Sequence, residues 1–223
     1  MEVGISVVTK TFEFGTSQLP GMLSIPRDAE GVVLFAHGSG SNRLSPRNRS
    51  VSDTLLQFGF ATFLLDLLHE QEAGDQQKVF DIELLADRLI EAIDWITTSV
   101  ITRNMKIGLF GASTGAAATL VAAALRIQSV GAIVSRGGRP DLAGSYLQNV
   151  EAPTLLIVGE QDEPVLQINK KALDIMHCPK RLVTIAGATH LFPKAGALEE
   201  VAQLTKEWFR TQLVGDSTRL VRK

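Results

Sequence analysis

The chain contains three residue types that together can carry out acyl transfer, and the first is a serine set between two glycines. Residues 111–115 read Gly-Ala-Ser-Thr-Gly, a G-x-S-x-G pattern in which a sharp strand-to-helix turn exposes the central serine. A neutral hydroxyl is a weak nucleophile and needs a base within hydrogen-bond reach. We predict that His190 accepts the Ser113 proton and that Asp162 orients the imidazole. Other carboxylates could replace Asp162, namely Glu160, Glu163 and Asp66.

The negative charge that develops on a carbonyl oxygen during acyl transfer requires preorganised donors. We expect these oxyanion donors to be two backbone N–H groups. One belongs to Thr114, at the start of the helix after the serine, and the other to Ser39, in the glycine-rich turn 37–41. We expect the side chain of His37 to hold that turn in place rather than to react.

The turn at residues 111–115 could instead bind the phosphates of a dinucleotide. That interpretation requires a further glycine where Ala117 stands and an acidic residue about 20 positions later, around Gly131, where none occurs. The only tyrosine, Tyr146, is followed four places later by Val150, so a Tyr-x-x-x-Lys pair is also absent. We therefore reject the nucleotide interpretation.

Apolar segments that end in turn residues alternate with segments of helical character. The expected buried strands lie at 32–36, 61–65, 107–110, 132–135, 154–158 and 182–186. The expected helices lie at 50–58, 81–96, 116–125, 165–176 and 198–211. Two earlier segments, 3–14 and 21–25, are predicted to form an antiparallel pair.

This alternation predicts an α/β fold with a mostly parallel sheet of about eight strands and helices on both faces. Right-handed crossovers place the carboxyl ends of the parallel strands along one edge, outside which ligands bind. The residues that follow such strand ends are His37, Ser113, Arg136, Asp162 and His190. We therefore expect them to converge.

Arginines gather near the same edge. They form two groups, Arg43, Arg47 and Arg49 after the expected oxyanion turn, and Arg136 and Arg139 after the strand that follows the serine. Forked guanidinium groups suit the recognition of carboxylates, so we hypothesise that one or more of these arginines binds an anionic group on the substrate. The alternative is that they pair with local acids such as Asp53 and Asp141, or face water.

The composition is that of a globular protein with one domain, which we place at residues 1–213, followed by a loose tail at 214–223. The formal net charge of -2 gives no reason to expect nucleic acid or a membrane surface as a partner. We expect neither a signal peptide nor a membrane span. The single cysteine, Cys178, excludes an internal disulfide and fits a cytoplasmic location. Without an H-E-x-x-H pattern or paired cysteines, we expect no metal site and no cofactor.

Together these features resemble the α/β-hydrolase fold and, within it, the dienelactone hydrolase family of small esterases without a lid. The resemblance covers nearly the whole chain and rests on four turns, at 37–39, 111–115, 159–162 and around residue 190. The chain order Ser, Asp, His is that of this fold. One departure lies at the centre of the G-x-S-x-G turn, where dienelactone hydrolases have cysteine and this chain has Ser113. The resemblance implies ester hydrolysis, while the serine leaves lactone specificity open.

The sequence therefore predicts a serine hydrolase that cleaves a small carboxylic ester or lactone through an acyl-enzyme. The same three residues could serve a thioesterase or a peptidase, and a binding protein without catalysis could also keep the fold. The short connection between residues 135 and 153 leaves no room for a large lid, which favours a small substrate. The substrate itself and the oligomeric state, a homodimer included, are left open by the sequence.

Overall fold

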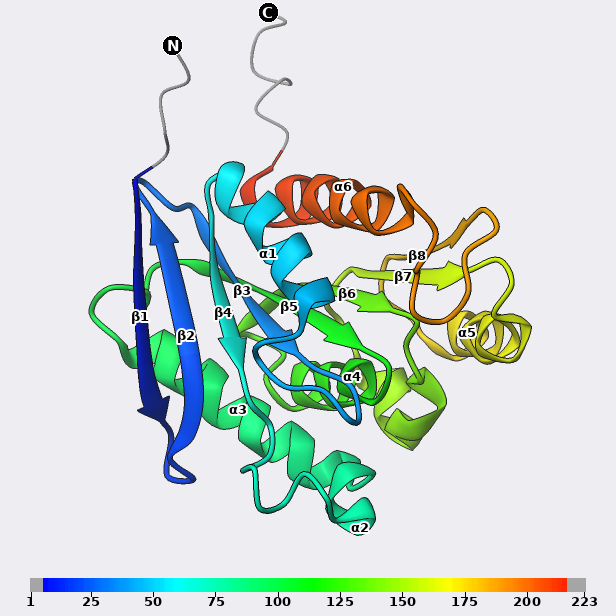
Figure 1. The fold of residues 1–223 in the computed structure, drawn as a ribbon, viewed down its shortest axis with the longest axis horizontal. Helices are drawn as coiled ribbons and strands as arrows, with labels where there is room; N and C mark the ends of the chain where they lie inside the picture. Colours follow the sequence, from blue (N-terminus) through cyan, green and yellow to red (C-terminus); the bar gives the residue numbers. More distant parts are fainter. Residues whose placement is uncertain (1–5, 216–223) are drawn as a thin grey trace, which may run out of the picture.

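The computed structural model describes residues 6–215 and contains one eight-stranded sheet between two layers of helices (Figure 1). The strand order is β1-β2-β4-β3-β5-β6-β7-β8. β1 (Val7–Phe14) and β2 (Leu19–Pro26) are antiparallel, and β2 is also antiparallel to β4 (Phe60–Leu65). The parallel part continues with β3 (Gly31–Ala36), β5 (Lys106–Ala112), β6 (Val130–Arg136), β7 (Thr154–Gly159) and β8 (Lys180–Ile185). The predicted architecture, a mostly parallel sheet with antiparallel first strands, is confirmed.

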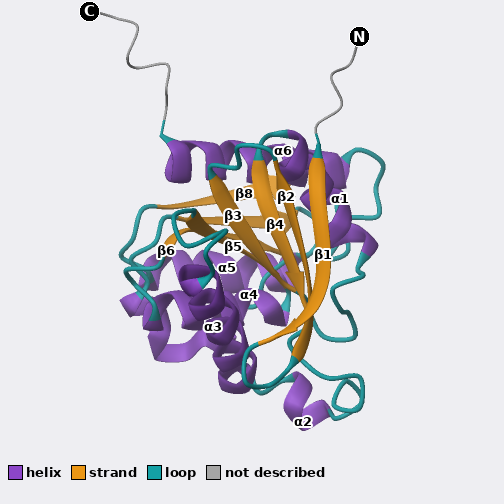
Figure 2. Ribbon diagram, turned by 90° about the vertical axis from the view of Figure 1, so that its left-hand side faces the viewer, coloured by secondary structure: helices purple, strands orange, loops and turns teal. Residues whose placement is uncertain are grey.

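The helices cover both faces of the sheet, as Figure 2 shows from the side. One face carries α1 (Pro46–Gln57) and α6 (Ala197–Phe209), which is followed by a short π-helical turn, η2 (Arg210–Val214). The opposite face carries α3 (Ile82–Thr98), α4 (Thr114–Leu125), α5 (Glu163–Ile175) and a 3₁₀ segment, η1 (Pro140–Asn149). A single short turn of helix, α2 (Gln76–Val79), precedes α3.

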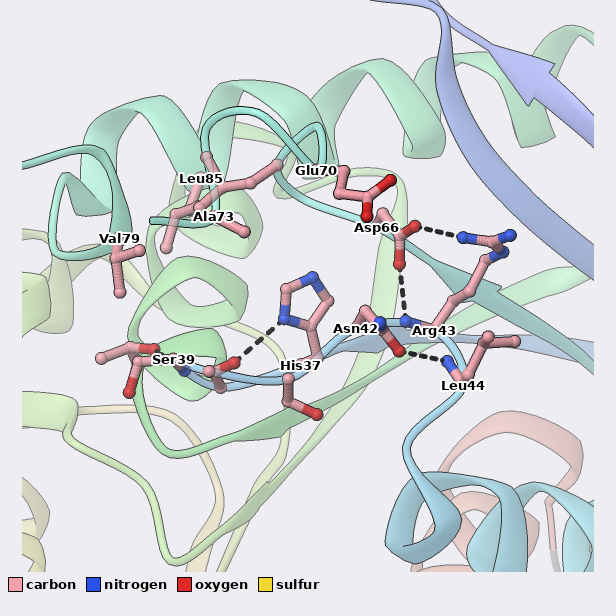
Figure 3. A pocket seen from close by; sticks show the side chains of 15 residues that line it. His37, Ser39, Asn42, Arg43, Leu44, Asp66, Glu70, Ala73, Val79 and Leu85 are labelled. Carbon is pink, nitrogen blue, oxygen red and sulfur yellow. Dashed lines mark hydrogen bonds and ion pairs between the residues drawn. The ribbon is translucent and has the colours of Figure 1, made fainter. Parts of the chain in front are cut away.

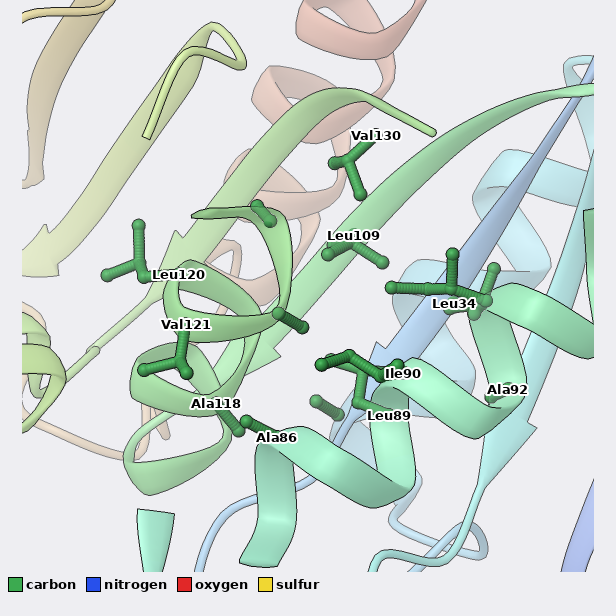
Figure 4. Close-up of a cluster of buried hydrophobic side chains, with 14 of the residues drawn as sticks. Leu34, Ala86, Leu89, Ile90, Ala92, Leu109, Ala118, Leu120, Val121 and Val130 are labelled. Atoms are coloured by element: carbon green, nitrogen blue, oxygen red, sulfur yellow. The ribbon is translucent and has the colours of Figure 1, made fainter. Parts of the chain in front are cut away.

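The helix that carries the serine turn is buried on almost every side. Residues 114–124 of α4 are all buried, and their small side chains let α3 approach closely, with Ala86 beside Ala118 in Figure 4. Leu89 of α3 is fully buried in the same cluster, and a side chain of that size contributes about 1.5–3 kcal/mol on burial. Because the core on this face holds α4 in place, the turn at the start of α4 rests on a rigid base.

Most predicted elements are found within a few residues of their expected bounds, and α1 is the main difference at a terminus. We expected this helix to begin at residue 50, but it begins at Pro46. The Ser45 hydroxyl accepts a hydrogen bond from the Asn48 N–H at 3.4 Å, and proline is favoured at the first helical position. The earlier start brings Arg47 into the first turn of α1.

One continuous sheet runs through the described residues, and Val214, which we expected in the tail, packs partly against the core beside α6. Most of the predicted tail, residues 216–223, lies outside the described residues. Between residues 6 and 215, no helix has the length and apolar character that crossing a membrane requires.

Candidate active site

Ser113 occupies a strained turn between β5 and α4. Its backbone angles are φ 51° and ψ -119°, a region that residues with a Cβ rarely adopt and that is often found at functional sites. The flanking glycines are required by close contacts. A Cβ at Gly111 would lie 2.4 Å from the Ala116 Cα, and one at Gly115 would lie 2.4 Å from the Ala36 carbonyl oxygen. The G-x-S-x-G spacing is therefore a consequence of how tightly β5, β3 and α4 meet.

Asp162 and His190 are brought together from the turns that follow β7 and β8. The Nδ1 atom of His190 lies 2.6 Å from Oδ2 of Asp162. A carboxylate accepts the proton on Nδ1, which leaves Nε2 as the nitrogen able to take up another proton. The Asp162 side chain is only 12% exposed, so solvent competes little for this contact.

Ser113 and His190 line one cavity of about 180 Å³. Within the described part of the chain, the Ser113 hydroxyl makes no hydrogen bond to the imidazole. Such bonds are often long in unliganded active sites and shorten when substrate binds. The structure thus places the predicted base and the predicted nucleophile at one cavity.

The alternative carboxylates have other roles. Glu160 Oε2 accepts a hydrogen bond from the Gly187 N–H at 2.7 Å, which braces the turn before His190. Glu163 Oε1 accepts from the Gln167 side chain within α5. Asp66 is occupied by Arg43, through the Arg43 backbone N–H at 2.6 Å and through its guanidinium at 2.5 Å. Asp162 is thus the carboxylate bonded to His190.

The turn after β3 is held by His37, as expected from the sequence. Nε2 of His37 accepts the Leu67 N–H at 3.0 Å, and Nδ1 donates to the Gly38 carbonyl oxygen at 3.0 Å. Burial lowers the pKa of His37, although its bond to Gly38 and the nearby Asp66 charge act in the opposite direction. The imidazole is therefore held in its neutral form.

Both predicted oxyanion residues lie beside the nucleophile, but one donor is already occupied. The Ser39 N–H donates to the Thr114 hydroxyl at 3.0 Å. The Gly38 N–H, by contrast, makes no hydrogen bond within residues 6–215, and a Cβ at Gly38 would lie 2.9 Å from the Ser113 Cβ. Sequence reasoning missed Gly38, although its place after the first buried strand was visible.

A second cavity of about 460 Å³ adjoins the first and shares Gly38, Ser39 and Ser41 with it. Figure 3 shows Val79 and Leu85 on one side and the Arg43–Asp66 pair on the other. The turn formed by Ser113 and Thr114 therefore lies where a small polar cavity meets a larger one with an apolar wall.

The predicted substrate-binding arginines divide into two kinds. Arg43 is paired with Asp66, and Arg139 is paired with Asp141 through two hydrogen bonds of 2.9 and 2.7 Å. Arg47 and Arg136, however, line the small cavity together with Ser113. Burial, reinforced by the charge of Arg47, lowers the pKa of Arg136 to about 10, so it remains a cation at neutral pH.

A metal site was not expected. Among the side chains of residues 6–215, no group of three or more His, Cys, Asp or Glu is arranged to hold a metal ion.

The sheet topology, the strained serine turn and the positions of Asp162 and His190 define the α/β-hydrolase fold. Residues 19–213 match the Dienelactone hydrolase family, and the chain belongs to that family. The family and fold predicted from the sequence are therefore confirmed, together with membership of a hydrolase family.

Solved structures give the same result. A dienelactone hydrolase from Anabaena variabilis is 52% identical, with a TM-score of 0.90 over 94% of this chain and 99% of its own. Est1E from Butyrivibrio proteoclasticus has a TM-score of 0.76 over 92% of this chain and 99% of its own. At 17% identity, Est1E shows the shared fold alone.

Two relatives from strains of Mycobacterium tuberculosis carry the name putative phosphoribosyl transferase. Each is 51% identical over 201 residues, which is 90% of this chain but 45% of the relative. The chain spans about half the length of the curated relatives it matches.

Proposed function

We propose that this protein is a carboxylic ester hydrolase that acts through an acyl-enzyme on Ser113. The observation that carries the proposal is the 2.6 Å contact between His190 Nδ1 and Asp162 Oδ2, made at the cavity to which Ser113 is exposed. A base oriented by a carboxylate is what a serine hydroxyl requires for nucleophilic attack.

In the acylation step, Nε2 of His190 accepts the Ser113 proton while Oγ bonds to the ester carbonyl carbon. The imidazolium, stabilised by Asp162, then gives this proton to the departing alkoxide, and the acyl group stays on Ser113. In deacylation, His190 takes a proton from water, whose oxygen bonds to the acyl carbon. The carboxylic acid leaves when Ser113 Oγ recovers the proton.

We assign the oxyanion to the Thr114 N–H and to a second amide of the turn after β3. The Gly38 amide needs no rearrangement to serve as this donor, whereas the Ser39 amide must first leave the Thr114 hydroxyl. Loss of one such donor typically costs about 2.7–4 kcal/mol of barrier.

The substrate we propose is a small ester or lactone, because the two adjoining cavities measure about 180 and 460 Å³. The name phosphoribosyl transferase belongs to relatives about twice as long. We assign that name to the part of those proteins that this chain does not match. A thioester or peptide remains chemically accessible to the same residues, and competition between p-nitrophenyl acetate and thioesters would measure it.

Treatment with a phosphonate ester tests the proposal against a non-catalytic binding protein. We expect stoichiometric labelling at Ser113 and loss of p-nitrophenyl acetate hydrolysis, and both should be absent in Ser113→Ala. His190→Ala should lose hydrolysis, whereas His177→Ala, at an exposed position two residues after the end of α5, should keep it. A folded protein with an unreactive Ser113 would contradict the proposal.

A further inference from the structure

Arg136 is a buried cation that forms no ion pair with a carboxylate of residues 6–215. It is the last residue of β6, and it is only 7% exposed. Neither Nε nor Nη1 has a hydrogen-bond partner within residues 6–215. Buried guanidinium groups are normally satisfied, because each unpaired polar group costs free energy. Arg136 is thus an exception that needs a cause.

Other arginines of this protein differ from Arg136 because they are paired with carboxylates. Four of them form ion pairs of 2.5–2.8 Å with carboxylates, namely Arg43 with Asp66, Arg88 with Glu72, Arg126 with Asp94 and Arg139 with Asp141. Some of these pairs are well exposed and gain little from pairing. Arg136, the most buried of these arginines, has no carboxylate partner in the part of the chain that the structure describes.

A second guanidinium faces the same cavity. Arg47 enters from the first turn of α1, and its Nε is also buried without a partner. Burial is the main cause of the lowered pKa of Arg136, and the positive charge of Arg47 lowers this pKa further. Two like charges held at one cavity repel each other, so an anion that enters the cavity stabilises the arrangement.

The lining of the cavity supports the same conclusion. Besides the two arginines, it contains the hydroxyl residues Ser41 and Ser45 and the amide of Asn48. None of the residues that line it, all of them described, is acidic. The Asn48 Oδ1 is a further buried atom without a partner, and it can accept a hydrogen bond from a ligand hydroxyl.

The guanidinium of Arg136 is also held in direction. It lies 5.8 Å from the centre of the Phe192 ring, within the range of a cation–π contact. A guanidinium restrained in this way loses less entropy on binding, and two of its N–H groups can donate to two oxygens of one anion at once.

We propose that this cavity binds a phosphate group of the substrate, so that the natural substrates are small phosphorylated esters. The inference rests on the proposed ester hydrolysis and adds the recognition element. A phosphate monoester is a dianion, which balances both guanidinium charges, and its three terminal oxygens offer acceptors to two forks. A carboxylate carries one charge and would leave the second cation uncompensated.

The proposal places the two ends of the substrate. The phosphate lies against Arg47 and Arg136, and the scissile carbonyl lies over Ser113 in the same small cavity, which shares Gly38 and Ser39 with the larger one. The larger cavity is left for the remaining group of the ester. The phosphate is not transferred, because Ser113 attacks the carbon of the ester and the phosphate remains attached to its carrier.

Three p-nitrophenyl esters of matched chain length test this assignment at pH 8: the 4-phosphonobutanoate, the hemiglutarate and the pentanoate. We expect kcat/KM for the phosphonate to exceed that of the neutral ester by about tenfold or more, with the carboxylate between them. Arg136→Met and Arg47→Met should each bring the three values together. Arg49→Met removes an exposed charge from the same helix and should preserve the order.

A binding measurement separates this inference from the hydrolase itself. Titration of Ser113→Ala with inorganic phosphate at constant ionic strength should show saturable binding that is lost in Ser113→Ala/Arg136→Met, and acetate should bind more weakly. Phosphate binding without any ester hydrolysis by the unaltered protein would sink the hydrolase and keep the anion site. Three equal kcat/KM values together with no phosphate binding would overturn the inference, as would a preference for the carboxylate.

Discussion

The backbone N–H of Ser113 donates a hydrogen bond to the carbonyl oxygen of Arg136, with an N···O distance of 3.3 Å. A second bond of 3.1 Å runs from the Arg139 N–H back to the Ser113 carbonyl oxygen. The turn that contains Ser113 is thus hydrogen-bonded through its backbone to the segment 136–139, which contains Arg136. Both contacts use backbone atoms only, so the side chain of Arg136 can be changed without removing either of them.

We therefore predict that Arg136→Met stabilises the folded protein. The side chain of methionine has similar length but no charge to bury, and replacing buried charges by apolar groups often gains about 1–4 kcal/mol. The pKa of Arg136 is lowered to about 10 in the folded protein. The unfolded state therefore binds more protons only above that pH, and at neutral pH the full cost of the buried charge is present.

Urea unfolding at neutral pH without phosphate measures this effect. Arg49→Met, which removes an exposed charge from α1, should stay within about 0.5 kcal/mol of the unaltered protein. A lower unfolding midpoint for Arg136→Met than for Arg49→Met would show that Arg136 stabilises the fold, contrary to our interpretation.

Asp162→Asn should lower kcat for p-nitrophenyl acetate by a factor on the order of 10⁴, as loss of the carboxylate does in other serine triads. The amide can present its NH₂ group to Nδ1, which favours the wrong tautomer of His190. Glu160→Gln is the matched control, because Glu160 follows the same strand but bonds to the Gly187 N–H. If kcat fell equally in the two variants, Asp162 would not be the carboxylate that orients His190.

Much of this arrangement could be predicted from local sequence. Apolar segments such as 107–110 and 182–186 located the strands, and their ends located Ser113 and His190, because parallel strands share one carboxyl edge. The start of α1 is also marked in the sequence, because Ser45 followed by proline is a helix-capping signal.

Side-chain partners could not be predicted in the same way. Arg43 and Asp66 are 23 residues apart, and nothing local distinguishes Arg43 from Arg47, whose buried Nε has no hydrogen-bond partner among residues 6–215. The same holds for the Ser39 N–H, whose occupancy depends on the rotamer of the Thr114 hydroxyl. These contacts are decided by how loops pack once the strands are in place.

Gly115→Ala should destabilise the fold and reduce hydrolysis together. The added Cβ would lie 2.4 Å from two backbone oxygens, those of Ala36 and His37, and backbone atoms cannot move aside as a side chain can. Such overpacking typically costs about 1–3 kcal/mol. Gly74→Ala is the control, since a Cβ there meets nothing within 4 Å. Urea unfolding and kcat would be measured for both, and a Gly115→Ala protein as stable and active as Gly74→Ala would refute the close contact.

His37 should make the fold sensitive to acid. Burial lowers the pKa of His37 below its ordinary value of 6.5. At pH values between the lowered pKa and 6.5, the unfolded state therefore binds more protons than the folded one. The neutral form of His37 contributes stability above pH 6.5, and this contribution is lost as the pH falls through the lowered pKa. Protonation of Nε2 also removes the acceptor of the Leu67 N–H.

His37→Gln cannot take up a proton in this range, so two effects separate. At pH 8 the variant should be less stable by about 1–3 kcal/mol, because the buried Leu67 N–H loses a well-placed acceptor. Between pH 8 and pH 5.5 the variant should then lose less stability than the unaltered protein, as measured by urea midpoints at both pH values. His177→Gln removes an exposed histidine and should follow the unaltered protein. If His37→Gln also followed it over this range, the acid sensitivity would have to come from a different group.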